Sequence, residues 1–458
     1  MREGLQKIVS LDETIAAIST PPGRSALGIV RISGPGTLSI VSRLFKSELP
    51  VEHRRAVVGN WVDINGEPLD QVVLTFAAKP NSYTGDDLVE VSAHGNPNVL
   101  YRILQSVFHA GARMATAGEF TLRAVANGKL DLMQAEAIHE FVQAQTEQQA
   151  RTQLRQIEGV ASKKVAPIQG ELIDLIAHME AGIDFAEDDV DVLHKEIIEK
   201  QLEAIRLRLA AVQSTFEYGR LLVEGLRVTI VGKPNVGKSS LFNRLLRSDR
   251  AIVTEIPGTT RDVLTEPISL NGVPLRISDT AGIRETQDRV EAIGVSRSLE
   301  MMSDSDVTIV VLDGSSPIAN EDESILRRAQ PQAHVVVVNK SDLSHAFELS
   351  SNGARVVRMS ALTGDGMEEL EAALGAFISD RRSDGADDFV LTSARQNQAL
   401  LRAMDCVSAA RVAVAKDVPH EMILLDLYAS LSALNEMTGE VVTEDILDKI
   451  FSSFCIGK

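Results

Sequence analysis

The sequence predicts a multidomain protein in which an α/β unit is inserted into a helical domain, and an α+β domain precedes both. Three observations predict this fold class. Strand-like runs dominate residues 1–120, helical periodicity dominates residues 121–219 and 386–458, and residues 220–385 alternate between strands and helices. Because the two helical segments flank the α/β unit, we expect them to pack together as one bundle. A chain of 458 residues is long enough for such a division.

Composition narrows the class of protein. The apolar content of 44% and charged content of 24% are ordinary for globular domains. The two cysteines, Cys406 and Cys455, are too few for a disulfide framework and predict reduced thiols. No apolar run approaches the roughly 18 residues of a membrane span, and the start MREGLQKIVS has no signal-peptide core, so we expect a cytoplasmic protein without a membrane segment. The net charge of −18 argues mildly against broad non-specific nucleic-acid binding.

The first domain shows strand and hairpin signals. Residues 29–32 and 72–76 are strand-like, Asn65-Gly66 separates two such runs as a hairpin turn, and residues 99–107 follow a helical pattern. The helical domain then shows apolar residues at helical spacing, broken by an acidic loop at 187–189. Its last part carries a leucine stripe at positions 424, 427, 431 and 434.

The α/β unit is predicted from five apolar runs that alternate with helical patterns. The expected strands are Val228–Val231, Leu275–Ser278, Val307–Leu312, His334–Val338 and Arg355–Met359. Asn271-Gly272 precedes the second of these as a hairpin turn, and the polar segment 379–388 is the expected exit linker.

The first predicted strand of this unit leads into a phosphate-binding loop. Residues 232–239 read GKPNVGKS and precede a helical pattern, which gives the strand, G-x-x-x-x-G-K-S and helix order that such a loop requires. Gly232 and Gly237 allow the backbone N–H groups to converge, and the helix N-terminus adds positive potential. Lys238 would reach the β- and γ-phosphates, and the Ser239 hydroxyl would bind Mg²⁺.

Four further motifs follow in the order that a guanine-nucleotide site needs. Asp279, in DTAG, would hold Mg²⁺ through water, and Gly282 N–H would contact the γ-phosphate. A threonine of GTTRD (258–262) would complete the Mg²⁺ shell, and SAL (360–362) would close over the base. Asp342, in NKSD (339–342), can accept two hydrogen bonds from guanine, which adenine cannot donate. The unit is therefore predicted to be a P-loop GTPase of the Ras-like kind that binds GTP and GDP.

The residues expected at the nucleotide are Asn235, Val236, Gly237, Lys238, Ser239, Ser240, Thr254, Glu255, Ile256, Pro257, Gly258, Thr259, Thr260, Asp279, Thr280, Ala281, Gly282, Asn339, Lys340, Asp342, Ser360, Ala361 and Leu362.

The hydrolytic machinery departs from the Ras pattern. Ile283 stands where Ras-like enzymes carry a water-orienting glutamine, and Glu291, further along, is the candidate for that role. Arg261 is either an arginine finger in cis or a structural switch residue, and the second is favoured. Lys233 is interpreted as a solvated loop residue.

With GKPNVGKSS, PGTTRD, DTAGIRE and NKSD, the α/β unit resembles the potassium-dependent, translation-factor-class GTPases of the TrmE–Era–EngA type. The segments TPPGRSALGIVRISG, SYTGDDLVEVSAHG and NGKLDLMQAEA and the C-terminal CIGK extend the resemblance over essentially the whole chain. Together they are similar to the MnmE (TrmE) family of tRNA uridine-modification GTPases.

This resemblance implies two metal sites and a coupled dimer. Ser239 and Thr260 would ligate Mg²⁺, and K⁺ would take the place of an arginine finger. Glu291 would orient the attacking water through a second water. Two such units would meet face to face during hydrolysis. The implied K⁺ ligands are the Asn235 side chain and the backbone around Thr254, Ile256 and Thr259.

The resemblance also implies a folate site in a dimeric N-terminal domain. Arg31, Glu90, Lys129 and Lys458 match the positions that contact a 5-formyl- or 5,10-methylene-tetrahydrofolate, although Arg31 and Glu90 alone would indicate an ordinary ion pair. Cys455 is a catalytic candidate in the family, while its apolar neighbours equally suit a buried contact.

The implied reaction installs an aminomethyl or carboxymethylaminomethyl group on C5 of the wobble uridine of certain tRNAs. The chain would act as a homodimer with the flavoprotein MnmG, which brings FAD. A regulatory GTPase of ribosome assembly, like Era or Der, is the alternative, but no RNA-binding appendage such as a KH module is evident. A membrane-linked fission GTPase is a third reading, and it lacks a lipid-binding segment.

Overall fold

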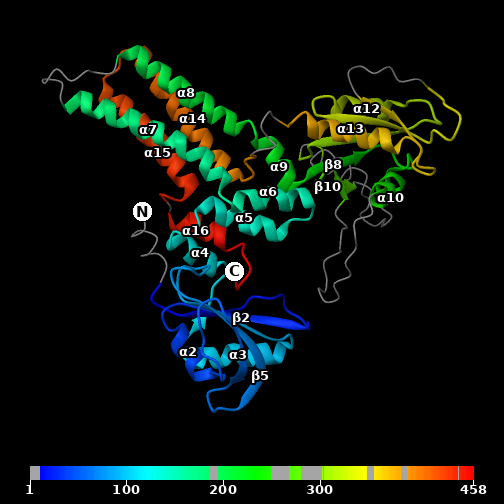
Figure 1. The fold of residues 1–458 in the computed structure, drawn as a ribbon. Coiled ribbons are helices and arrows are strands. Elements are labelled where there is room, and N and C mark those ends of the chain that lie inside the picture. The colour runs from blue at the N-terminus through cyan, green and yellow to red at the C-terminus, as the bar shows by residue number, and fades with distance from the viewer. Residues whose placement is uncertain are drawn as a thin grey trace. The chain divides into compact units, whose positions relative to one another are not determined.

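The computed structural model describes residues 11–184, 194–248, 268–279, 302, 304–347, 355–382, 389–441 and 443–458. The chain divides into two compact units (Figure 1). The first unit comprises Met1–His139, Gln156–Leu209 and Gln398–Lys458, and the second comprises Glu140–Arg155 and Ala210–Asn397.

The first unit contains a mixed sheet of seven strands in the order β3-β4-β5-β6-β2-β1-β7. Alternate residues of these strands pack beneath helices α2 (Thr37–Leu44) and α3 (Pro97–His109) and form one apolar core. The buried Trp61 indole donates a hydrogen bond of 3.0 Å to Ser106 Oγ of α3. The strands are β1 (Ile15–Ile18), β2 (Leu27–Ser33), β3 (Phe45–Lys46), β4 (Ala56–Val62), β5 (Pro68–Ala77), β6 (Leu88–His94) and β7 (Arg113–Met114).

The predicted strands at 29–32 and 72–76 are confirmed within β2 and β5, and the predicted helix at 99–107 is confirmed within α3. Asn65-Gly66 lies in the turn between β4 and β5, which pair antiparallel.

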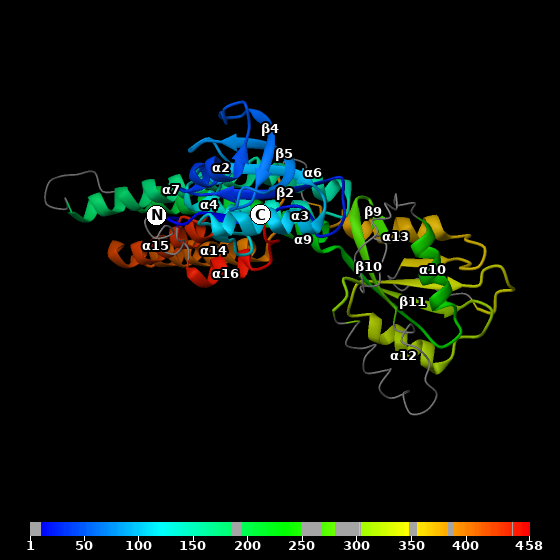
Figure 2. The same ribbon diagram turned by 90° about the horizontal axis from the view of Figure 1, so that it is seen from below.

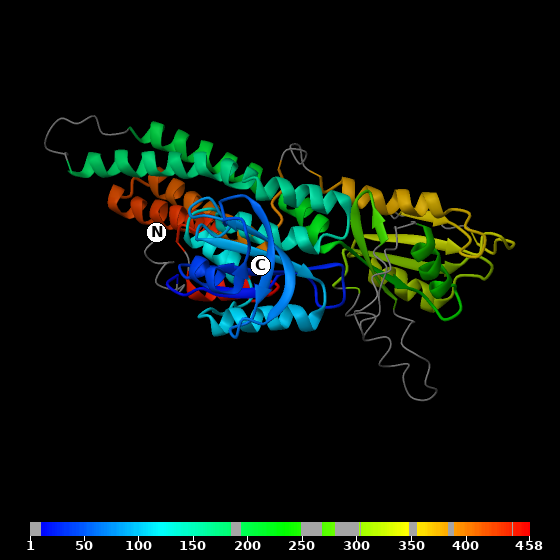
Figure 3. The ribbon, with the colours of Figure 1, turned by 60° about the horizontal axis from the view of Figure 1, so that its bottom comes forward.

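The helices of the first unit come from both sides of the inserted segment. In α7 (Val160–Asp184), Gln169 Nε2 donates 2.8 Å to Asn435 Oδ1 of α15 (His420–Thr438), and the two helices pack side by side (Figure 3). The predicted leucine stripe buries positions 424, 427 and 434 of α15. The expectation that the flanking helical segments share one bundle is therefore confirmed. The other helices are α4 (Glu119–Ala126), α5 (Leu132–Gln143), α8 (Lys195–Gln213), α14 (Ala394–Ala415) and α16 (Glu444–Phe451).

The second unit is built on a sheet of six strands in the order β13-β12-β11-β8-β10-β9. All neighbours are parallel except β9 and β10, which form the hairpin predicted at Asn271-Gly272. The strands are β8 (Leu226–Val231), β9 (Ile268–Leu270), β10 (Val273–Asp279), β11 (Val307–Asp313), β12 (His334–Asn339) and β13 (Arg355–Arg358). All five predicted strands are confirmed.

Helices cover both faces of this sheet (Figure 2). Apolar residues of α9 (Phe216–Glu224), α10 (Lys238–Ser248) and α13 (Met367–Ser379) form the larger core with one face. Helix α12 (Asn320–Ala329) packs on the other face through Ala329. The first part of α6 (Glu147–Ile157) belongs to this unit, where Thr146 Oγ1 donates 2.7 Å to Gly272 O. A doubly wound sheet of this kind presents its ligand site at the carboxyl ends of its strands.

Candidate functional site

The loop between β8 and α10 has the backbone of a phosphate cradle. Gly232 and Gly237 have φ angles of 154° and 98°, in the region that favours glycine. A Cβ on Gly237 would lie 2.2 Å from Asn339 Nδ2, and a Cβ on Gly232 would lie 2.4 Å from Val311 O. Only glycine fits these two positions, so the spacing predicted from the sequence is required by the fold.

The Lys238 ammonium lies against this loop. Lys238 is the first residue of α10, and its Nζ donates 2.9 Å to Gly232 O and 2.7 Å to Lys233 O. These two bonds hold the positively charged ammonium against the first residues of the loop. Ser239 and Asn235 are exposed beside it. The helix N-terminus and the lysine together make this end of the loop favourable for an anion such as phosphate.

Asn339 ties three loops together at the carboxyl edge of the sheet. The side chain is 3% exposed; its Nδ2 donates 2.7 Å to Val236 O, and its Oδ1 accepts 2.9 Å from Ala361 N. The Asn339 carbonyl also accepts 2.8 Å from Gly314 N. The phosphate loop and the 360–362 loop are thereby held to the end of β12.

The neighbouring residues of NKSD form the other half of this edge. Lys340 Nζ lies 2.6 Å from Asp313 Oδ2 at the end of β11. Burial alone would raise the pKa of Asp313, but hydrogen bonds from Lys340 and Ser315 outweigh it and lower that pKa. Asp342 is exposed, and Leu362, 80% exposed, follows the buried Ser360. Asp342 follows β12 and Leu362 follows β13, and an exposed carboxylate and an exposed apolar side chain at this edge of the sheet are the groups that suit a planar base with N–H donors on one edge.

The interpretation of Lys233 as a solvated residue is wrong. Its Nζ lies 2.6 Å from Asp322 Oδ2, and the two side chains are 21% and 5% exposed. Asp322 lies in α12, which meets the opposite face of the sheet from α10, so the packing of distant elements creates this pair.

Part of the predicted nucleotide and metal set lies outside the described residues. Strand β10 ends at Asp279, which leads directly into that part of the chain. The residues outside the description are Thr254, Glu255, Ile256, Pro257, Gly258, Thr259, Thr260, Arg261, Thr280, Ala281, Gly282, Ile283 and Glu291. Their roles stay predictions.

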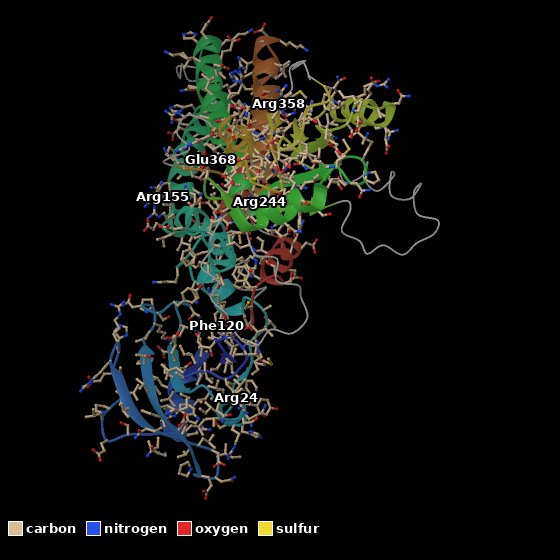
Figure 4. All side chains as sticks on the ribbon, turned by 90° about the vertical axis from the view of Figure 1, so that its right-hand side faces the viewer. Arg24, Phe120, Arg155, Arg244, Arg358 and Glu368 are labelled. Atoms are coloured by element: carbon tan, nitrogen blue, oxygen red, sulfur yellow. The ribbon has the colours of Figure 1, made fainter. Side chains whose placement is uncertain are left out.

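A second polar cluster lies on the sheet face opposite α2 and α3. The β2–β6 register places Arg31 directly across from Glu90, and Arg31 Nε and Nη2 donate 3.0 and 2.7 Å to Glu90 Oε1. The guanidinium also lies 5.6 Å from the Tyr83 ring centroid and 5.5 Å from that of Phe120, which is labelled in Figure 4. The ion pair that the sequence suggested for Arg31 and Glu90 is therefore present, and the rings of Tyr83 and Phe120 lie next to its guanidinium.

The C-terminal tail completes this cluster. Arg31 Nη1 and Ser19 Oγ donate 3.1 and 3.0 Å to Gly457 O, and Ile456 forms an antiparallel bridge with Ala117. Gly457 has φ 101°, and a Cβ there would lie 2.6 Å from Ile18 O. The tail therefore docks through its backbone at a position that requires glycine.

Three predicted folate residues, Arg31, Glu90 and Lys458, belong to this cluster. Burial and the nearby Arg31 lower the pKa of Lys458, while Cys455 opposes that shift. Burial and Lys458 also lower the pKa of His139, whose ring centroid lies 4.8 Å from that of Phe454. Lys129 is exposed just after α4.

The Cys455 thiol is free and exposed, so the buried apolar contact considered for it is wrong. Its neighbour Phe454 makes that apolar contact instead, at 6% exposed.

A buried ion network fixes α4 next to the cluster. Glu119 accepts 2.8 and 2.7 Å from Arg113 and 3.1 Å from the fully buried Arg123. Burial would raise the pKa of Glu119, but these bonds and one from Thr116 N outweigh it and lower that pKa. The network holds Phe120 against Arg31.

Several residues of the nucleotide site and of the cluster around Arg31 were not predicted from the sequence. Asp313 at the carboxyl end of a strand carried a usable signal, because that sheet edge forms the site. Arg244 of α10, labelled in Figure 4, donates to Thr363 O in the loop after β13, and no sequence motif predicts that contact. Tyr83 and Asp322 likewise carry no local signature.

Among the described residues no helix is both long and apolar enough to cross a bilayer, and no group of three His, Cys, Asp or Glu side chains is arranged to hold a metal ion.

Comparison with known proteins gives matches over nearly the whole chain. The family model of the GTP-binding protein TrmE N-terminus matches residues 14–129, and that of the MnmE helical domain matches residues 132–455. The tRNA modification GTPase MnmE of Koribacter versatilis is 44% identical over 98% of this chain and all of that protein. The Aquifex aeolicus protein of the same name is 43% identical over 97% of this chain and all of that protein. The G domain of the T. maritima iron transporter FeoB is 23% identical over 33% of this chain and 98% of that chain, with a TM-score of 0.26.

Proposed function

The chain belongs to the MnmE family of tRNA modification GTPases, and from that premise we propose that it is a K⁺-dependent GTPase that modifies C5 of the wobble uridine of certain tRNAs. It works with the FAD-containing partner MnmG and takes the added carbon from methylene-tetrahydrofolate. The product is an aminomethyl or carboxymethylaminomethyl uridine. The reaction would take place in the cytoplasm.

The observation that carries the GTPase part is the position of Asn339, which joins the phosphate loop to the 360–362 loop through bonds of 2.7 and 2.9 Å. This geometry supports a bound nucleotide with its phosphates at Lys238 and its guanine at Asp342. Ser239 would ligate Mg²⁺, which offsets phosphate charge when bound. Lys238 would stabilise the β- and γ-phosphates.

The potassium part rests on Asn235. It is exposed at the crown of the loop with φ 64°, which an asparagine tolerates better than most residues. Its side chain would ligate K⁺, and the backbone of 254–259 would enclose the ion. Glu291 would orient the attacking water, and face-to-face dimerisation of two G units would order these segments.

The one-carbon part rests on the cluster around Arg31. Guanidinium and ammonium groups of Arg31, Lys129 and Lys458 suit the carboxylates of a tetrahydrofolate, and Glu90 suits the N–H groups of its pterin. The partly exposed Tyr83 ring beside Arg31 offers an apolar wall for a flat ring, while the fully buried Phe120 ring supports the Arg31 guanidinium from the protein interior. The exposed Cys455 thiol is available as a nucleophile.

The family resemblance implies MnmG as the partner and tRNA as the substrate, and the charge balance of this chain fits that division. A net charge of −18 leaves this chain a weak carrier of tRNA on its own, so MnmG would supply much of the basic surface. The N-terminal domain would hold the constitutive homodimer. The full-length relatives weigh against a role in ribosome assembly.

The first test is GTP turnover by the full chain in buffers of equal ionic strength that contain K⁺ or Na⁺, over a range of protein concentration. We expect strong stimulation by K⁺, its loss in Asn235→Ala and near-complete loss of turnover in Glu291→Ala. Asn320→Ala, an exposed asparagine at the start of α12, is the matched control and should keep the stimulation. Equal turnover in both salts would contradict the potassium mechanism and return attention to Arg261.

The second test measures the modification itself. Nucleoside analysis of tRNA from cells that lack the gene should show unmodified wobble uridine, restored by the wild-type chain. Binding of 5-formyl-tetrahydrofolate should weaken in Glu90→Gln. Unchanged tRNA in the deletion strain would contradict the proposed function while leaving the GTPase activity intact.

A further inference from the structure

The ion pair between Lys233 and Asp322 connects the phosphate loop to a helix on the opposite face of the sheet. Lys233 is the second residue of GKPNVGKS, and Asp322 is the third residue of α12. Their charged atoms lie 2.6 Å apart, and the carboxylate side chain is 5% exposed. The position is too buried for the pair to be an ordinary surface contact.

The carboxylate is itself held in place by its helix. Asp322 Oδ2 also accepts 2.9 Å from Ala319 N, at the residue that precedes α12. A buried carboxylate is costly without a cation, so Asp322 favours the loop conformation that brings Lys233 to it. The side chain of Lys233 is therefore tethered at the N-terminus of α12.

The main chain of the same residue contacts the phosphate lysine. Lys233 O accepts 2.7 Å from Lys238 Nζ, alongside the 2.9 Å bond to Gly232 O. A chain of polar contacts thus runs from Asp322 through the Lys233 side chain to the Lys233 carbonyl, and from that carbonyl to the Lys238 ammonium. Movement of the Lys233 peptide would displace the Lys238 ammonium directly.

We propose that Lys233 and Asp322 are a positioning pair for GTP and GDP: the ion pair fixes the Lys233 peptide so that its carbonyl orients Lys238 toward the β-phosphate. The inference rests on the proposed role of the 232–239 loop in holding phosphate. Neither residue touches the nucleotide. Nucleotide binding requires the intact ion pair, so replacing Lys233 or Asp322 has the same effect on the affinity for GDP.

The test is a double-mutant cycle on the full chain, read as the Kd for the fluorescent N-methylanthraniloyl derivative of GDP in Mg²⁺ buffer. Lys233→Ala and Asp322→Asn should each weaken binding by about tenfold, because a displaced Lys238 ammonium would lose roughly one hydrogen bond to a charged phosphate oxygen. The double variant should also bind the GDP derivative about tenfold more weakly than wild type, and not a hundredfold more weakly, since the two changes remove one shared contact. Lys233→Arg keeps a cation for Asp322 and should stay within about threefold of wild type.

Glu323→Gln is the matched control. Glu323 pairs with Arg327 on the surface of the same helix, with side chains 60% and 71% exposed, and should leave the Kd unchanged. The unfolding temperature of each nucleotide-free variant is measured in parallel. If Lys233→Ala unfolds, the double variant, which leaves no unpaired buried charge, still reports the loss.

The possible outcomes separate the explanations. A loss in Lys233→Ala with none in Asp322→Asn overturns the proposal and means that Lys233 contacts phosphate itself. Lower unfolding temperatures with an unchanged Kd overturn it in favour of a purely structural pair. Lys238→Ala tests the premise: unchanged GDP binding in that variant contradicts the proposed nucleotide site, whatever the cycle shows.

Discussion

Asn339→Ala is the perturbation with the clearest calculated effect. The asparagine side chain satisfies Val236 O and Ala361 N, and Val236 and Ala361 are only 2% and 7% exposed. Alanine leaves both groups without this partner. Each unpaired buried group costs about 1–3 kcal/mol, so the two together cost about 2–6 kcal/mol. The loss falls on the joint between the phosphate loop and the 360–362 loop.

The assay combines nucleotide affinity with local stability. If the two loops come together only when GDP binds, the free energy of leaving these two groups unpaired opposes binding. Its lower bound of about 2 kcal/mol then weakens GDP binding by about 25-fold. Hydrogen exchange followed by mass spectrometry should show faster exchange at the peptide containing Ala361, by a similar factor, because the amide loses its acceptor. Asn320→Ala, exposed on the surface of the same unit, should change neither quantity.

Asn339→Asp sharpens the experiment. The aspartate can still accept from Ala361 N but presents a second oxygen to Val236 O, so at neutral pH it should bind GDP no better than the alanine variant. A neutral carboxyl could donate that second bond, and its deficit should therefore shrink toward pH 5. GDP affinity within twofold of wild type in both variants would refute the reasoning, because it would mean that the two loops assemble without this side chain.

Three further predictions follow from the described contacts. Glu119→Gln should destabilise the first unit by about 3 kcal/mol by leaving the fully buried Arg123 without its closest carboxylate. Because the pKa of Glu119 is lowered below 4.5 in the fold, wild type loses this stability as the pH falls through the folded value, and the variant should lack that acid-dependent loss in urea unfolding; identical pH profiles would contradict the network. Gly457→Ala should release the C-terminal tail, since its Cβ would meet Ile18 O, and faster hydrogen exchange at residues 455–458 would show it; unchanged protection would contradict the docking geometry. Asp342→Asn should weaken GTP binding by at least about a hundredfold and favour xanthosine triphosphate, measured by competition; undiminished GTP affinity would exclude Asp342 as the guanine contact.

The sequence alone predicted the layout of the chain and the nucleotide motifs. Strand positions in the second unit followed from short apolar runs, and the phosphate loop followed from glycine spacing, because both depend on neighbours within a few residues. The direction of the strands was also constrained, since the parallel strands of a doubly wound sheet place the loops after β8, β12 and β13 at one edge. These features are local, and their chemistry can be read in chain order.

Only the tertiary structure decided which charged groups meet. Arg31 and Gly457, 426 positions apart, come together because the register of β2 and the docking of the tail bring them to one sheet face. Lys233 looked solvated because nothing near it in sequence is acidic, and α12 supplies Asp322 from a different layer. The thiol of Cys455 is exposed while its neighbour Phe454 is buried, which depends on how α16 packs. Periodicity fixes which face of an element is apolar, but the partner of a polar side chain depends on the register and packing of elements far apart in the chain.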